Sequence, residues 1–138
     1  MRAGHARTGH AGSDDGRTDL PDDVAQIQAS SAANARMRRE GTANLIAAAR
    51  AAGASRLLAQ SVAWDPAGDG ADAKRALERA VLDFGGVVIR YGQLYGSGTY
   101  YPDPDNLPGV PRIDVDAAAR RTIDALDLTA QIVTITDD

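Results

Sequence analysis

Residues 85–98, GGVVIRYGQLYGSG, decide the fold that we expect of this chain. Within them, Val87–Tyr91 is a continuous run of β-branched and aromatic side chains around one arginine. Such a run is typical of a strand that is buried on both faces, as in a parallel sheet covered by helices. Gly85 and Gly86 favour the end of a helix just before the strand, and the glycines after it favour a loop.

Helices and strands alternate on the N-terminal side of this strand. We expect a helix at Ala71–Asp83, preceded by a loop dense in turn residues. Before that loop, the apolar stretch Arg56–Val62 favours a short buried strand. Strong helix formers extend from Asp23 to Ala52, and Gly53 is placed to end that helix in a left-handed conformation.

The same alternation continues on the C-terminal side. Gly92–Pro111 is rich in glycine and proline and is expected to be mostly loop. A brief strand at Arg112–Val115, a helix at Ala117–Leu126 capped by Asp116, and a last strand at Gln131–Thr136 follow. This order predicts an α/β fold in which parallel strands are joined by crossovers and flanked by helices.

Composition and charge bound the class of protein. With 138 residues, 43% of them hydrophobic and 25% charged, the chain suits one globular domain. Aromatic residues make up only 4%, so Ala, Val, Leu and Ile must form the core, and we expect modest stability. A net charge of −4 argues against a nucleic-acid or anionic-membrane partner. Without cysteine, and with two histidines only, the sequence predicts no metal site.

The first residues differ in composition from the rest. We expect residues 1–18 to form a disordered leader, because Gly, His, Arg, Asp and Ser dominate there without apolar periodicity. Residues 19–138 then form one domain. No apolar run approaches the roughly 18 residues that suggest a membrane span, and no signal-peptide core is present. The expected location is therefore cytoplasmic.

Four motifs, taken in order, resemble the NAD(P)-dependent epimerase/dehydratase family, that is, the extended or atypical short-chain dehydrogenases/reductases. They are the helix segment EGTANLIAAA at 40–49, the strand at 56–61, the loop RYGQLYGSG at 90–98 and the junction IDVDAAA at 113–119. The resemblance implies a Rossmann-like, doubly wound sheet that binds NAD or NADP. It also implies a reaction on a sugar-like or other small hydroxyl or carbonyl substrate.

Two family signatures are missing. No glycine-rich turn follows a strand, so the usual phosphate-binding element is absent and we expect an N-terminally truncated sheet without its first strands. The Tyr-x-x-x-Lys pair is also broken, because Gly70 stands four residues before Lys74. Val62 falls at the catalytic Ser/Thr position and Ser61 lies one residue earlier. We therefore predict no catalytic residue and little activity for the chain on its own.

Six residues are candidates for cofactor binding because the resemblance places them along the cofactor. They are Gln60, Ser61, Tyr91, Gly92, Gln93 and Tyr95. Simpler roles remain open for each: the serine could bond loop backbone, the tyrosines could pack with one wet end, and the glycine could serve a turn.

Several other polar residues have a structural interpretation that we favour. Lys74 and Glu78 are expected to be a weak i,i+4 pair on a helix face, and Arg38 to lie on a solvated helix face beside two further arginines. Trp64 is interpreted as a loop anchor, although it could stack on a ligand.

An alternative function belongs to a different class. The chain could be a non-catalytic remnant, or a module that binds a nucleotide or a partner. An exposed sheet edge where the missing strands should pair would favour a homo-oligomer or a complementing partner.

Overall fold

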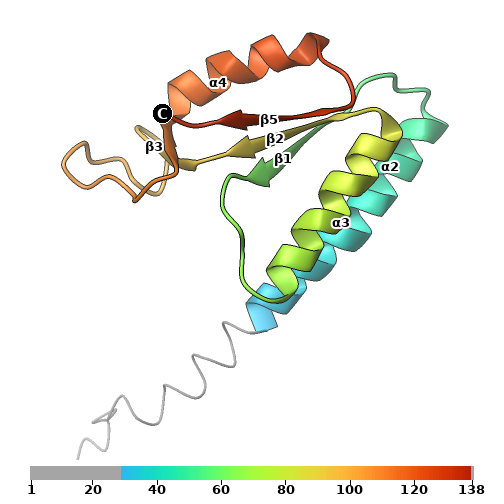
Figure 1. Cartoon of the computed structure of the whole chain (residues 1–138), viewed down its shortest axis with the longest axis horizontal. Helices are drawn as coiled ribbons and strands as arrows, with labels where there is room; N and C mark the ends of the chain where they lie inside the picture. The colour runs from blue at the N-terminus through green and yellow to red at the C-terminus, as the bar shows by residue number, and fades with distance from the viewer. Residues whose placement is uncertain (1–28, 138) are drawn as a thin grey trace, which may run out of the picture.

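The computed structural model describes residues 29–137. The expected leader at 1–18 and the first residues of the long helix lie outside this range. Three parallel strands form the central sheet in the order β1-β2-β5: Leu58–Val62, Val87–Tyr91 and Gln131–Ile135 (Figure 1). The predicted α/β fold with a parallel sheet and flanking helices is confirmed, and it is compatible with a partial Rossmann-like fold.

A long helical segment precedes β1. Residues 29–36 are helical, a π-helical turn η1 follows at Met37–Gly41, and α2 spans Thr42–Ala51. Gly53 has a φ of 71° and ends the segment as predicted. The sequence gives no indication of the π turn, which lies in the middle of the expected helix.

Helix α3, Asp69–Phe84, covers one face of the sheet. Its apolar residues Leu77 and Val81 pack against Val88 of β2, and α2 lies beside α3. Gly85, with a φ of 92°, ends α3 in the left-handed conformation.

Helix α4, Val115–Asp124, and the short 3₁₀ helix η2, Ala125–Asp127, cover the opposite face (Figure 1). The main core cluster lies between them and the sheet and contains Val87, Ile89, Ile113, Ala118, Ala125 and Ile135. The prediction that Asp116 caps this helix is wrong. Asp114 has the extended backbone of an N-cap, and its Oδ2 accepts the Ala117 N–H at 3.0 Å.

A second, two-stranded parallel sheet extends from the end of β2. Strand β3, Gln93–Tyr95, pairs with β4, Arg112–Asp114. The sequence suggested loop for β3, because the pairing depends on a partner that is distant along the chain. Gly92 permits this arrangement, since a Cβ there would lie 2.7 Å from the backbone of Arg112.

The two crossovers of the main sheet differ in hand. The strand order moves in one direction from β1 to β2 to β5, yet α3 and α4 cover opposite faces. The usual right-handed connection can therefore apply to only one of them. The connection from β2 to β5 also contains β3 and β4, so it is more than a simple strand–helix–strand unit.

None of the helices within residues 29–137 combines the length and the apolar character that a membrane crossing requires.

Candidate functional site

The carboxyl ends of β1 and β2 carry a buried polar cluster, the Glu78 cluster, made of Ser61, Glu78 and Arg90. Ser61 is 2% exposed and its Oγ donates to Glu78 Oε1 at 2.7 Å. Arg90 donates to both carboxylate oxygens of Glu78, at 2.9 and 2.6 Å. The hydrogen bond from Arg90 is the main reason that the pKa of Glu78 is lowered, against the opposing effect of burial. The same bond raises the pKa of Arg90.

Lys74 lies one turn before Glu78 on the same buried face of α3. Its Nζ donates to the Trp64 carbonyl at 2.9 Å and to Asp65 Oδ1 at 3.2 Å. The side chain of Lys74 is 8% exposed, whereas that of Asp65 is almost fully exposed. The expected i,i+4 pair of Lys74 and Glu78 on a helix face is not formed, because both residues are buried and their side chains bond different partners.

Gly70 lies at the position where the resemblance would place a tyrosine. A Cβ at Gly70 would lie 2.8 Å from Pro66 Cβ, so the loop before α3 closes over this position. The four tyrosines of the chain all fall within 91–101, and none of them bonds Lys74. Lys74 therefore lies near the end of β1 without a tyrosine partner among residues 29–137.

The six residues predicted to bind a cofactor are distributed over three places. Ser61 faces α3, while Gln60 and Tyr91 face the α4 side of the sheet. Gln60 is exposed, and the Tyr91 hydroxyl bonds the Thr122 hydroxyl of α4.

The other three lie where the chain passes from β2 into the second sheet: Gly92 precedes β3, and Gln93 and Tyr95 belong to it. Gly92 is buried, and its N–H donates to Ile135 O at 3.0 Å. Gln93 Nε2 donates to the Gly109 carbonyl at 3.2 Å, and the Tyr95 hydroxyl donates to Asp137 Oδ2 at 2.6 Å. That bond raises the pKa of Tyr95. The structure thus brings Gln93 and Tyr95 onto one strand but does not gather all six around one cavity.

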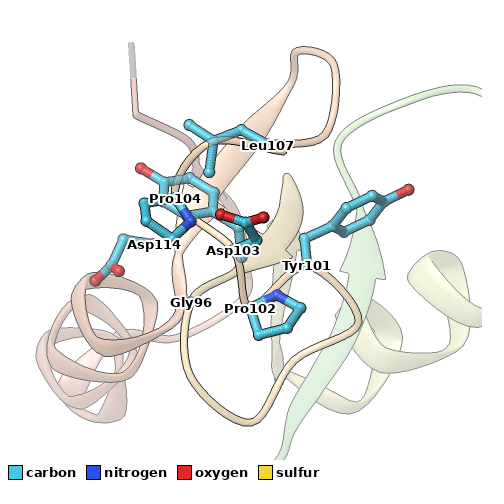
Figure 2. A pocket seen from close by; sticks show the side chains of 8 residues that line it. Gly96, Tyr101, Pro102, Asp103, Pro104, Leu107 and Asp114 are labelled. Atoms are coloured by element: carbon cyan, nitrogen blue, oxygen red, sulfur yellow. The ribbon is translucent and has the colours of Figure 1, made fainter.

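A cavity of about 210 Å³ lies at the carboxyl ends of β3 and β4 (Figure 2). Its lining comprises Tyr95, Gly96, Tyr101, Pro102, Asp103, Pro104, Leu107 and Asp114. Figure 2 shows Asp103 among the loop prolines, with the Tyr101 ring directed away from Asp114. Each of the two carboxylates in the lining already accepts one backbone hydrogen bond: Asp114 Oδ2 accepts the Ala117 N–H, and Asp103 Oδ1 accepts the Asp105 N–H at 2.9 Å.

A second cavity, of about 200 Å³, lies beside the carboxyl end of β1; we name it the Arg38 cavity. It is lined by Ser31, Asn34, Ala35, Arg38, Val62, Trp64, Pro66 and Gly70. Sequence reasoning placed Arg38 on a solvated face and did not consider Ser31 or Asn34. A signal was available, because residues 31, 34, 35 and 38 share one face of a helix.

No group of three or more metal-ligating side chains is present within residues 29–137.

Comparison with known proteins finds one informative relative. The chain is 43% identical over 109 residues to a Streptomyces sp. protein named 3-diazoavenalumate denitrifying reductase. The match covers 62% of this chain and 34% of that protein, so the chain spans about a third of the relative's length. No family model matches the sequence, and no solved structure matches the chain.

Proposed function

We propose that this chain forms the nicotinamide-side part of an NAD(P)-dependent reductase that acts on a small organic substrate. The observation that carries the proposal is the Lys74 ammonium group, held at the carboxyl end of β1 in a chain with a reductase homologue. The carboxyl ends of parallel strands are where open α/β sheets bind ligands.

Lys74 has the donor capacity that a ribose needs. An ammonium group has three N–H donors, and two of them are directed to Trp64 O and Asp65 Oδ1. The third is free for a hydroxyl acceptor. In the family that the motifs resemble, the lysine of this helix holds the cofactor ribose, and this geometry suits that role.

The residues fit only part of a dinucleotide. The sequence contains no strand followed by a glycine-rich turn at a helix N-terminus, which is the usual site for pyrophosphate. We therefore assign the nicotinamide and its ribose to this chain and leave the phosphates without a site on it. When bound, the nicotinamide would supply the hydride.

The missing tyrosine constrains the substrate. In the related enzymes the tyrosine exchanges a proton with a hydroxyl or carbonyl oxygen. Because Gly70 replaces it here, we favour a substrate whose reduction produces no alkoxide. The relative's name refers to a diazo compound, which is not a ketone, and this supports the same choice.

A titration with nicotinamide mononucleotide, AMP and NADPH tests this proposal. We expect saturable binding of the mononucleotide in the millimolar range, about −4 kcal/mol, and no binding of AMP. NADPH should bind no more tightly than the mononucleotide, because its phosphates and adenosine find no site. Micromolar binding of NADPH, or equal binding of AMP, would contradict the assignment.

Two variants locate the site. Lys74→Met should abolish binding of the mononucleotide, whereas Arg75→Met should leave it unchanged. Arg75→Met is the matched control, because it removes the same charge one residue away. Within residues 29–137, the Arg75 side chain forms an ion pair with the exposed Asp72. Far-ultraviolet circular dichroism of both variants separates loss of binding from loss of fold.

A second candidate function rests on the outer edge of β1. Within the described part of the chain, β1 pairs with β2 alone and leaves its other side without a partner strand. A chain of this kind could be a non-catalytic module that another polypeptide completes. Light scattering that finds a stable monomer across a wide concentration range would argue against this candidate.

A further inference from the structure

We infer that the Arg38 cavity binds a small organic carboxylate with a planar apolar group, and that this is the substrate class of the proposed reductase. The inference rests on the proposed function for the role of the ligand, but the binding itself is independent of it. Three features carry it: a guanidinium group that has no partner among residues 29–137, the small volume, and a lining that includes Trp64.

Arg38 supplies the anion-binding group. It is the single charged residue among the eight that line the cavity, and it is half-buried. Within residues 29–137 its guanidinium group has no hydrogen-bond or ion-pair partner, whereas the nearby carboxylate of Glu40 is paired with Arg36. A guanidinium group presents a rigid fork of donors that matches a carboxylate.

Ser31 and Asn34 lie on the same helix face as Arg38 and also line the cavity. Their hydroxyl and amide groups can donate to or accept from further polar atoms of a ligand. Arg38 belongs to the π-helical turn η1, a distortion that is frequent at functional sites. One wall of the cavity is thus polar and carries a net positive charge.

Part of the lining is apolar. Val62, Trp64 and Pro66 contribute to it, and Trp64 is partly exposed. An indole ring offers a flat surface for stacking. With about 200 Å³, the cavity is smaller than the roughly 300–1,000 Å³ of sites for drug-sized ligands. It therefore suits a single ring with one carboxylate and excludes a nucleotide.

The cavity adjoins the proposed nicotinamide site. Trp64 is one of the lining residues, and its carbonyl accepts a hydrogen bond from Lys74. A ligand anchored on Arg38 is thereby placed beside the end of β1, where the hydride would be delivered. Arg38 orients the substrate by its charge and takes no part in proton transfer.

Benzoate is the probe, and the fluorescence of Trp64 is the readout, since it is the sole tryptophan of the chain. We expect saturable quenching by benzoate, and binding at least about tenfold weaker for benzamide and acetate, which lack the charge or the ring. Inorganic phosphate should not compete. Equal binding of benzamide, or tighter binding of phosphate, would overturn the inference.

Arg38→Met should weaken benzoate binding by about tenfold or more, as expected for loss of a charged hydrogen bond. Arg39→Met is the matched control, because Arg39 is exposed and does not line the cavity. If Arg38→Met fails to fold, Arg38→Gln replaces it, and benzoate binding that is unchanged in a folded variant would refute the inference. Parallel titration with nicotinamide mononucleotide distinguishes the two proposals: Arg38 variants should retain that binding and Lys74→Met should lose it.

Discussion

Glu78 of α3 and Arg90 of β2 form a two-point ion pair, with Arg90 Nε donating to Oε1 at 2.9 Å and Nη2 to Oε2 at 2.6 Å. The carboxylate side chain is 7% exposed and the guanidinium side chain 34% exposed. Ser61 donates to the same carboxylate, so three elements, β1, α3 and β2, are connected through one side chain. A charge that is buried in this way must keep its partners.

Replacing Arg90 by methionine should lower the free energy of unfolding by about 2 kcal/mol, because the Glu78 carboxylate loses its main donor. The loss is smaller than for a fully buried pair, since part of the guanidinium group remains in water. Urea denaturation measures it. Arg56→Met is the control: Arg56 and Asp127 are both exposed, and the change should be within about 0.5 kcal/mol. Equal losses in the two variants would contradict the role of burial.

Acid should weaken the fold partly through Glu78. The pKa of this carboxyl is lowered in the folded chain, chiefly by the hydrogen bond from Arg90, so folding favours the ionised form. The associated stability is fully present above the ordinary carboxyl pKa, and it is lost as the pH falls through the lower folded value. Unfolding measured from neutral pH to pH 3 should show a smaller decrease for Glu78→Gln than for the wild type. Parallel curves would show that Glu78 titrates alike in both states.

Gly92→Ala should destabilise the chain by about 3 kcal/mol, because the new Cβ would meet three backbone atoms of Arg112 at 2.7–2.8 Å. Backbone atoms at this distance cannot rotate away as a side chain can. Gly109→Ala is the matched control, since no atom lies within 4 Å of the added Cβ and its φ is not positive. A similar melting temperature for the two variants would mean that the Arg112 backbone does not pass so close to Gly92.

Gly70→Tyr recreates the spacing of the Tyr-x-x-x-Lys motif with Lys74 but should destabilise the fold by about 1–3 kcal/mol. The cause is the approach of Pro66 Cβ to 2.8 Å from the new Cβ. Adding Pro66→Gly removes that atom, so a double-mutant cycle should show a favourable coupling between the two changes. Strict additivity would exclude Pro66 as the obstacle.

Tyr95 should ionise at a higher pH than an ordinary tyrosine. Its hydroxyl donates to Asp137, and this bond is the main cause of the raised pKa. In an ultraviolet absorbance titration, Asp137→Asn should shift one tyrosine of the four to lower pH, and Tyr95→Phe should remove that transition. Loss of a different transition in Tyr95→Phe would assign the shifted group to another tyrosine.

Local patterns were sufficient for the main elements of the fold. The apolar run at Val87–Tyr91 gave β2 with its observed limits, and the glycines at 53 and 85 ended the helices where the backbone turns left-handed. These features depend on neighbouring residues and on steric rules of single positions. The alternation of the elements then implied a parallel sheet, which is the arrangement found.

Tertiary contacts decided what the sequence could not. Strand β3 exists because β4 pairs with it. The N-cap of α4 is Asp114 rather than the expected Asp116, because α4 follows β4 directly. The Glu78 cluster could not be predicted from the sequence for the same reason. A charged side chain such as Glu78 looks solvated in a sequence, and only the packed sheet reveals that Arg90 and Ser61 make its burial possible.

The two ends of the segment 94–110 are held together by a hydrogen bond in which the Gln93 N–H donates to Pro111 O at 2.8 Å. The adjacent Gly92 N–H donates to Ile135 O. After β3, residues 96–110 form a loop that carries most of the lining of the cavity in Figure 2. Its length and composition can change without disturbing the layers beneath, because loop closure adds little free energy as a loop grows. This loop can therefore be replaced, in evolution or by protein engineering, so that ligand preference changes while the sheet and its helices stay the same.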